Sequence, residues 1–349
     1  LIFATTTFSQ TKVDSLLRVC EKATNTQKTT IYIELAKATF KESALSNSYN
    51  RKAFDLAVVQ KQLPEQAKSV YYTGRIYSAV RDFTDAIRYY EKALPLFRQL
   101  NDTLAMADCY RYIGIANFNM SKSKEAIASY LEGLKLAKNK LDYTAELLGN
   151  IGLVHNEMDN VNEAIHYFRQ ALSINQSIRD IESMAVNYDY LGATYSRMKM
   201  PESSLVNYHK ALYYFQKIRK EDRYAVSLSN MAWILPNYPD SLNKAISYFN
   251  QAWGKFQELG WVHYEPNIQF GIANILYKQG KLEESVSAYK KSILLANQFK
   301  REFFLKKQLY QGLSEVYQKK GDYKHALENQ ILCSKYNDSI TEKQKFDQV

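Results

Sequence analysis

One residue pattern recurs along most of this 349-residue chain at intervals of about 40 residues. Each copy begins at a small residue, the anchor, and has a second small residue twelve positions on, an aromatic residue sixteen on and a third small residue nineteen on. The clearest copy holds Gly74, Ala86, Tyr90 and Ala93. The seven anchors are residues 74, 114, 152, 192, 232, 273 and 314, spaced 40, 38, 40, 40, 41 and 41 apart. Such a fixed period predicts stacked copies of one supersecondary unit.

The other copies keep these offsets with side chains of similar size. Their members are Gly114, Ala126, Tyr130 and Gly133; Gly152, Ala164, Phe168 and Ala171; Gly192, Ser204, Tyr208 and Ala211; Ala232, Ala245, Phe249 and Ala252; Ala273, Ser285, Tyr289 and Ser292; and Ser314, Ala326, Gln330 and Cys333. The copy anchored at Ala232 has one extra residue in its turn, and the stretch from Leu35 to Ala57 looks like a degenerate first copy.

The composition and the local periodicity both favour helices. The chain has 12 glycines and 6 prolines, too few for the many turns of a β-sandwich or a barrel. In the copy anchored at Gly152, the residues Leu147, Leu148, Ile151 and Val154 follow the i, i+3, i+4 spacing of one apolar helix face. Small anchors let two antiparallel helices approach closely, and the aromatic residue fills the space beside them. The sequence therefore predicts an all-α fold of helix pairs.

This spacing resembles the tetratricopeptide repeat (TPR) family, in its branch with repeats of about 40 residues instead of 34. The resemblance implies a TPR α-solenoid, a right-handed superhelix of about 8 antiparallel helix pairs that bury their apolar stripes against one another. We expect the array to span residues 11–336, with the degenerate repeat at 31–60 and seven clear repeats at 67–336.

The two ends of the chain differ from the repeats. Residues 1–10 are apolar and then small, like the end of a secretory signal peptide with its cleavage region, and we interpret them as a signal-peptide remnant. Residues 337–349 are polar, with Ile340, Phe346 and Val349 spaced as on a helix. We expect them to form the start of a truncated connecting helix.

The prolines mark expected irregularities. Pro236 and Pro239 lie beside the one-residue insertion, so we expect an irregular turn there. Pro201 falls in a predicted turn, Pro266 suits the first position of a helix, and Pro95 predicts a kink near a helix end.

No catalytic or metal-binding motif is present. The sequence has no phosphate-cradling Gly-rich loop, no nucleophile elbow and no zinc-binding His pair. The cysteines Cys20, Cys109 and Cys333 lie far apart, and His155 occupies a packing position of its repeat. We therefore predict a non-catalytic chain without metal or cofactor. This prediction concerns the chain itself, and a full-length parent protein could carry a kinase domain.

The charge is positive but diffuse. The net charge is +10, and 14 Lys or Arg against 8 Asp or Glu lie between Lys278 and Lys345. No dense basic block with interleaved aromatic residues accompanies this excess, so we read it as the solvated face of long helices and predict no binding to nucleic acid.

The TPR resemblance implies a ligand, commonly a peptide, in a concave groove lined by the first helix of each pair. Carried onto this sequence, the lining positions are Tyr71, Arg75, Arg111, Asp189, Trp233, Phe270, Asn274, Tyr277 and Glu315, with Arg197 just beyond. Aromatic residues with arginines suit an extended peptide or an anionic group. The Lys and Asn pair with which co-chaperone members hold a C-terminal carboxylate is missing, which disfavours a heat-shock-chaperone adaptor.

Three functions are compatible with this pattern. The layout resembles the exported TPR sensor region of bacterial, Bacteroidetes-like histidine kinases or LuxR-type regulators, which implies a periplasmic or other extracytoplasmic location and contact with the membrane only through a missing C-terminal segment. The first alternative is a cytoplasmic peptide-pheromone receptor resembling Rap-type regulators. The second is a passive scaffold for a protein complex. Any of the three allows a homodimer.

Overall fold

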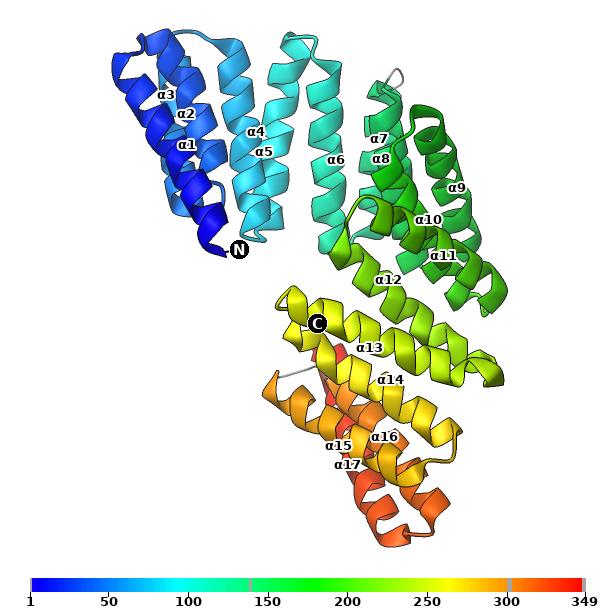
Figure 1. Ribbon diagram of the computed structural model, residues 1–349. Helices are drawn as coiled ribbons and strands as arrows, with labels where there is room; N and C mark the ends of the chain where they lie inside the picture. Colours follow the sequence, from blue (N-terminus) through cyan, green and yellow to red (C-terminus); the bar gives the residue numbers. More distant parts are fainter. Residues whose placement is uncertain (1, 138–139, 300–302, 347–349) are drawn as a thin grey trace. The chain divides into compact units, whose positions relative to one another are not determined.

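The computed structural model describes residues 2–137, 140–299 and 303–346, and within them the chain is built from α-helices with three short 3-10 helices and no strand. The helices form two compact units, residues 1–180 and 181–349. One helix, α1 (Ile2–Lys22), precedes eight antiparallel pairs, so the predicted all-α solenoid of about 8 pairs is confirmed. Figure 1 shows the pairs side by side within each unit.

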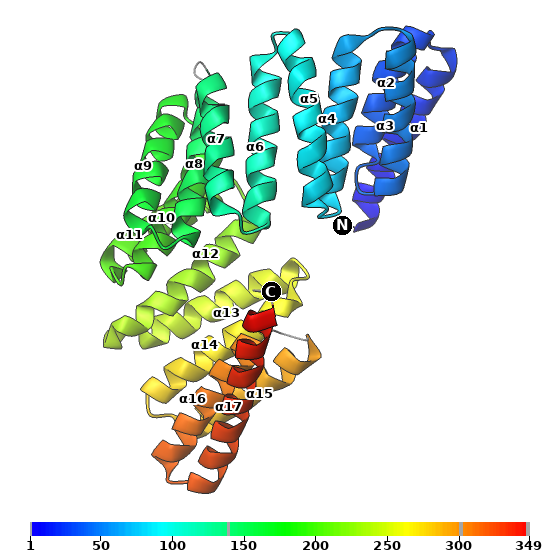
Figure 2. The same ribbon diagram turned by 180° about the vertical axis from the view of Figure 1, so that it is seen from behind.

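The first unit contains α1 and four pairs. They are α2 (Asn25–Ala38) with α3 (Ser43–Val59), α4 (Leu63–Ala79) with α5 (Phe83–Gln99), α6 (Thr103–Asn119) with α7 (Ser123–Leu136), and α8 (Leu141–Glu157) with α9 (Val161–Ile178). Seen from behind in Figure 2, these helices run alternately up and down.

The second unit contains the other four pairs. They are α10 (Ile181–Arg197) with α11 (Pro201–Lys217), α12 (Glu221–Ile234) with α13 (Leu242–Glu258), α14 (Glu265–Lys278) with α15 (Leu282–Gln298), and α16 (Phe303–Lys320) with α17 (Tyr323–Phe346).

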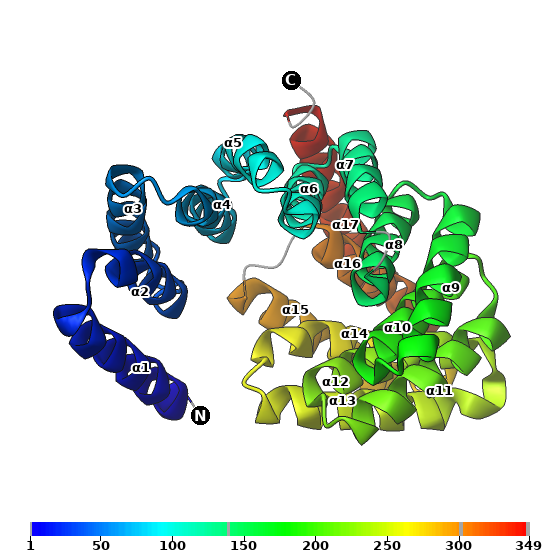
Figure 3. The same cartoon turned by 90° about the horizontal axis from the view of Figure 1, so that it is seen from above.

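The first helices of the pairs lie on one side of each unit and the second helices on the other. In the first unit, Figure 3 shows α4, α6 and α8 on one side and α5, α7 and α9 on the opposite side. In the second unit α10 approaches α12 directly, α12 approaches α14, and α14 approaches α16. We call the side made by α2, α4, α6, α8, α10, α12, α14 and α16 the first-helix face of its unit.

Close packing explains the small anchors. A Cβ atom added at Gly74 would lie 2.7 Å from the ring of Tyr90, and one added at Gly152 would lie 2.7 Å from the ring of Phe168. Such distances are not tolerated in a packed interior. The aromatic residue sixteen positions after the anchor thus packs directly on the anchor, and both rings are fully buried.

Serines at these close contacts also join the two helices of a pair. The hydroxyl of Ser204 donates to the carbonyl of Gly192 at 2.6 Å, and Ser285 donates to Ala273 at 2.8 Å. In the last pair the direction is reversed, because Ser314 is the anchor and donates to Ala326 at 2.8 Å. Each of these buried hydroxyls therefore has a hydrogen-bond acceptor, a backbone carbonyl of the neighbouring helix.

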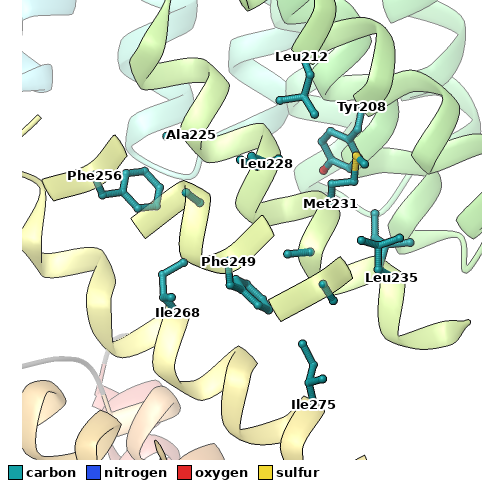
Figure 4. Close-up of a cluster of buried hydrophobic side chains, with 14 residues drawn as sticks. Tyr208, Leu212, Ala225, Leu228, Met231, Leu235, Phe249, Phe256, Ile268 and Ile275 are labelled. Atoms are coloured by element: carbon teal, nitrogen blue, oxygen red, sulfur yellow. The ribbon is translucent and has the colours of Figure 1, made fainter. Parts of the chain in front are cut away.

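Neighbouring pairs share a continuous core. In the second unit one cluster gathers Tyr208 and Leu212 of α11, Leu228 and Met231 of α12, and Phe249 of α13, together with residues of α14 (Figure 4). A single pair has no such interior, so stacking supplies most of the apolar burial.

The turns repeat at half the period of the pairs. Left-handed residues end the helices at 61, 81, 101, 121, 159, 179, 199, 219, 260, 280 and 321, and only the last three of these are glycines. The next backbone N–H donates to the carbonyl five residues back, as from Asp82 to Tyr77 at 3.0 Å. This hydrogen bond is the mark of a Schellman cap, which satisfies carbonyls at a helix end.

The prolines behave partly as predicted. Pro236 and Pro239 lie in two short 3-10 helices, Leu235–Asn237 and Pro239–Ser241, so that turn is irregular. Pro266 is in the first turn of α14. Pro201 is the first residue of α11 and not part of the turn, because a proline suits the N-terminal position of a helix. The helix α5 continues through Pro95 to Gln99.

The ends of the chain are described only in part. The described part excludes Leu1, the side chains of residues 2–10 and residues 347–349. Most of the features that predicted a signal-peptide remnant at 1–10 therefore lie outside it. Residues 337–346 continue α17 without a break, so the helix expected to start there is an extension of the last repeat.

Candidate ligand-binding face

All ten predicted lining residues lie on first helices. They fall into two groups: Tyr71, Arg75 and Arg111 in the first unit, and Asp189, Arg197, Trp233, Phe270, Asn274, Tyr277 and Glu315 in the second. The register of the repeat therefore places them on the first-helix face of their own unit, and each group is described by itself.

The first unit holds a hydrogen-bonded cluster centred on Asp108 of α6. The hydroxyl of Tyr71 on α4 donates to one carboxylate oxygen of Asp108. The hydroxyl of Tyr143 on α8 donates to the other at 2.7 Å, and Arg111 binds that same oxygen at 2.7 Å. Burial by itself raises the pKa of Asp108, but the Arg111 charge and these hydrogen bonds outweigh it, so the pKa lies below its ordinary value. Three consecutive first helices are thus joined through one carboxylate.

Arg111 is fully engaged inside this cluster. Besides Asp108, its guanidinium binds Glu146 of α8 at 2.7 Å. It also lies over the ring of Tyr112, 4.2 Å from the ring centroid. Only 14% of the side chain is exposed. Two carboxylates therefore neutralise this arginine, and it mainly holds α6 against α8.

Arg75 has a different environment. Its guanidinium lies 4.4 Å from the ring centroid of Tyr112 and 5.6 Å from that of Phe40. Its Nη1 atom is 3.5 Å from the hydroxyl of Tyr71. Aromatic rings attract a cation through their negative faces, so the rings fix the position of this guanidinium.

The second unit buries a carboxylate on the same kind of face. Asp189 of α10 is 8% exposed and accepts a hydrogen bond from the hydroxyl of Ser227 on α12. Burial raises the pKa of Asp189 to about 6, against the lowering effects of that hydrogen bond and of the Arg223 charge. A buried carboxylate with a raised pKa is typical of functional sites.

Aromatic residues continue this face toward α14. Trp233 is 40% exposed, and its ring packs against Phe249 at 5.3 Å and against Phe270 at 5.4 Å between centroids. Asn274 accepts a hydrogen bond from the hydroxyl of Tyr289 at 2.6 Å, which orients its amide. A large, partly open indole supported by rigid rings is the usual form of a binding hot spot.

The remaining predicted residues lie at the margins. Lys319 lies over the ring of Tyr277, 4.8 Å from the centroid, and Glu315 accepts a hydrogen bond from Gln311 of its own helix at 3.2 Å. Arg197 is the last residue of α10. Among the residues that the structure describes, no three His, Cys, Asp or Glu side chains gather as metal ligands, and no helix is long and apolar enough to cross a membrane.

Comparison with known proteins identifies the repeats. A family profile described as tetratricopeptide repeat matches residues 67–139, and a second profile with that description matches residues 145–178 and 266–299. These segments are tetratricopeptide repeats. The matched TPRs contain most of the Asp108 cluster in the first unit, and Phe270, Asn274 and Tyr277 in the second.

Relatives of known name share this repeat architecture. The chain is 26% identical over 243 residues to response regulator aspartate phosphatase E of Bacillus subtilis, which covers 69% of this chain and 54% of that protein, so the chain spans about half of that relative. The structure of aspartyl phosphate phosphatase F from Bacillus subtilis has a TM-score of 0.61 at 12% identity, covering 83% of this chain and 75% of that chain. A Rap protein complexed with competence and sporulation factor has a TM-score of 0.54 at 14% identity, covering 93% of this chain and 99% of that one. These structures share the TPR fold.

The partners that complete both groups were not predicted from the sequence. Asp108, Tyr143 and Glu146 surround Arg111, while Ser227 and Arg223 face Asp189. Asp189 and Ser227 are 38 residues apart, and Tyr71 and Asp108 are 37 apart. In a TPR array with a 40-residue period, residues separated by almost one period lie on adjacent first helices. Searching for polar pairs at that separation would have found them.

Proposed function

We propose that this TPR chain is a receptor domain that binds a peptide or a short extended segment of a protein on its first-helix face. The observations that carry the proposal are a buried carboxylate, Asp189 on α10, and a partly open indole, Trp233 on α12, the next first helix. Burial of a carboxylate is unfavourable for folding. A binding role explains its presence.

The chemistry of this face suits a peptide. The carboxylate of Asp189 accepts the Ser227 hydroxyl and keeps further acceptor capacity for a backbone N–H or a cationic side chain of the ligand. Trp233, supported by Phe249 and Phe270, offers an apolar surface to a ligand side chain. Asn274 presents an oriented amide one helix further along. Apolar anchoring with a few fixed polar groups is the common plan of peptide recognition.

The relatives support a signalling role for this binding. One is named a response regulator aspartate phosphatase, and one structural neighbour is a Rap protein complexed with competence and sporulation factor. A peptide receptor of the Rap-like kind is therefore the form of the proposal that we favour. This chain covers only part of the first relative. Any activity of the whole protein to which this chain belongs is therefore a proposal.

The extracytoplasmic sensor of a membrane-anchored regulator is a second form of the same binding function. It rests on the apolar, signal-like composition of residues 1–10. The two forms differ in compartment, and fractionation of the native host with an antibody against this chain separates them. Recovery in the periplasm supports the sensor, and recovery in the cytoplasm supports the Rap-like receptor.

The binding test uses a random heptapeptide library displayed on phage. We expect selection on the whole chain to enrich a peptide family whose members, once synthesised, bind in solution. Trp233→Ala should weaken that binding by about 30-fold, the usual loss at an aromatic hot spot. Tyr213→Ala is the matched control, because Tyr213 is 60% exposed but lies on a second helix of the same unit. Equal affinities of the two variants, or no enrichment at all, would contradict the proposal.

A further inference from the structure

On the first helices of the first unit, Lys37, Lys68 and Arg111 each form an ion pair with a carboxylate. Lys37 of α2 binds Glu34 at 2.6 Å, and Arg111 of α6 binds both Asp108 and Glu146. Arg75 of α4 lies between them along the stack. Within the described ranges, no carboxylate is within ion-pair distance of Arg75.

The surroundings of Arg75 are aromatic. Phe40 from the turn after α2, Tyr71 from α4 and Tyr112 from α6 face its guanidinium, at the distances given above. The Tyr71 hydroxyl is oriented by its own donation to Asp108. Desolvation by these rings lowers the pKa of Arg75, but the hydroxyls of Tyr71 and Tyr112 outweigh it, so the group stays charged. A cation is therefore held in place with N–H donors that no protein carboxylate uses.

Rings that fix a guanidinium also prepare it for a ligand. The planar fork matches a carboxylate in two parallel hydrogen bonds. Because the rings restrict the side chain before binding, little conformational entropy is lost when the ligand arrives. We infer that Arg75 receives a carboxylate of an acidic peptide. This inference rests on the proposed peptide binding and adds the charge of the ligand on this unit.

The carboxylate has two possible sources in a peptide, an acidic side chain or the C-terminus. Three fluorescein-labelled heptapeptides separate them. The first alternates leucine with glutamate and is amidated, the second alternates leucine with glutamine and is amidated, and the third is the leucine–glutamine peptide with a free C-terminus. Binding of each to the whole chain is measured by fluorescence anisotropy at low and at physiological salt.

We expect at least one carboxylate-bearing peptide to bind about tenfold more tightly than the amidated leucine–glutamine peptide, as one charge-assisted pair provides. Arg75→Gln should abolish that preference, and Arg75→Lys should restore part of it. Arg98→Gln is the matched control, because it removes the same charge from an exposed position on α5, a second helix of the same unit. Arg75→Met keeps the apolar stem on the Tyr112 ring and replaces Arg75→Gln if that variant melts early.

Three results would overturn the inference. The first is equal affinity of the wild-type chain for all three peptides. The second is an equal loss in Arg75→Gln and Arg98→Gln, which indicates general charge attraction. The third is the absence of binding to any carboxylate-bearing peptide. If the phage-selected peptides still bind and lose affinity in Trp233→Ala, the proposed peptide binding is supported although Arg75 does not have the inferred role.

Discussion

At the scale of single residues, two carboxylates on first helices, Asp108 and Asp189, have opposite environments. Asp108 is surrounded by donors and a cation, and its pKa is lowered. Asp189 has one hydroxyl donor, and burial dominates its pKa, which rises to about 6. The first carboxylate therefore stabilises its unit as an anion, while the second is more favourable when protonated.

The raised pKa of Asp189 predicts how the second unit responds to pH. Its ordinary pKa of about 3.9 is below the folded-state value of about 6, so the folded chain holds this proton more tightly. The contribution of Asp189 to stability is complete below pH ~4 and is lost as pH rises through ~6. Asp189→Asn keeps an acceptor for Ser227 without a charge, so at pH 8 the free energy of unfolding of the variant should be higher than that of wild type by up to about 3 kcal/mol.

Denaturant unfolding at pH 4, 6 and 8 measures this effect. The difference between variant and wild type should grow with pH, while the exposed control Asp240→Asn should show no such trend. Peptide binding should fall in the same Asp189→Asn variant, because function and stability oppose each other at a binding site. A variant that is less stable than wild type at pH 8 would refute this account of Asp189.

At the scale of helices and turns, much was predictable from sequence spacing. The offsets of Gly74, Ala86 and Tyr90 report a contact within one helix pair, and such contacts repeat wherever the pair repeats. The turns were harder, because residues such as Arg81 and Lys199 adopt a conformation usually marked by glycine. The Asp108 cluster was hardest, because its members come from three pairs and each looks like an ordinary surface residue by itself.

These left-handed turns predict stabilising substitutions. A non-glycine residue in this conformation is strained by about 1 kcal/mol. Glycine removes this strain, but it also gives the unfolded chain more conformational freedom, which offsets part of the gain in stability. Lys199→Gly, in the turn after α10, should therefore raise the unfolding free energy by about 0.5 kcal/mol. The matched control Lys210→Gly, at an exposed position inside α11, should lower it by about 1 kcal/mol. Chemical denaturation of both variants checks the two signs, and a loss in Lys199→Gly would show that the turn is not strained.

At the scale of the whole molecule, repetition provides both stability and a surface for recognition. Within each unit the pairs contact their neighbours, so side chains on successive first helices form one face in each unit without any loop dedicated to binding. Because the repeat itself forms this face, little in the sequence marks it as a binding site. What marks the face is the departure from the repeat, namely a buried carboxylate, an open indole and an arginine held by rings.

Hydroxyl-radical footprinting of the whole chain, with and without a phage-selected peptide, tests the central claim most directly. Side chains on the first-helix face should be protected by the peptide, above all Trp233 and Phe270 in the second unit. Exposed rings on second helices, Tyr213 and Tyr323, should be oxidised equally in both samples. Protection of Tyr213 or Tyr323 with unchanged oxidation of Trp233 would contradict the claim that the ligand binds on the first helices.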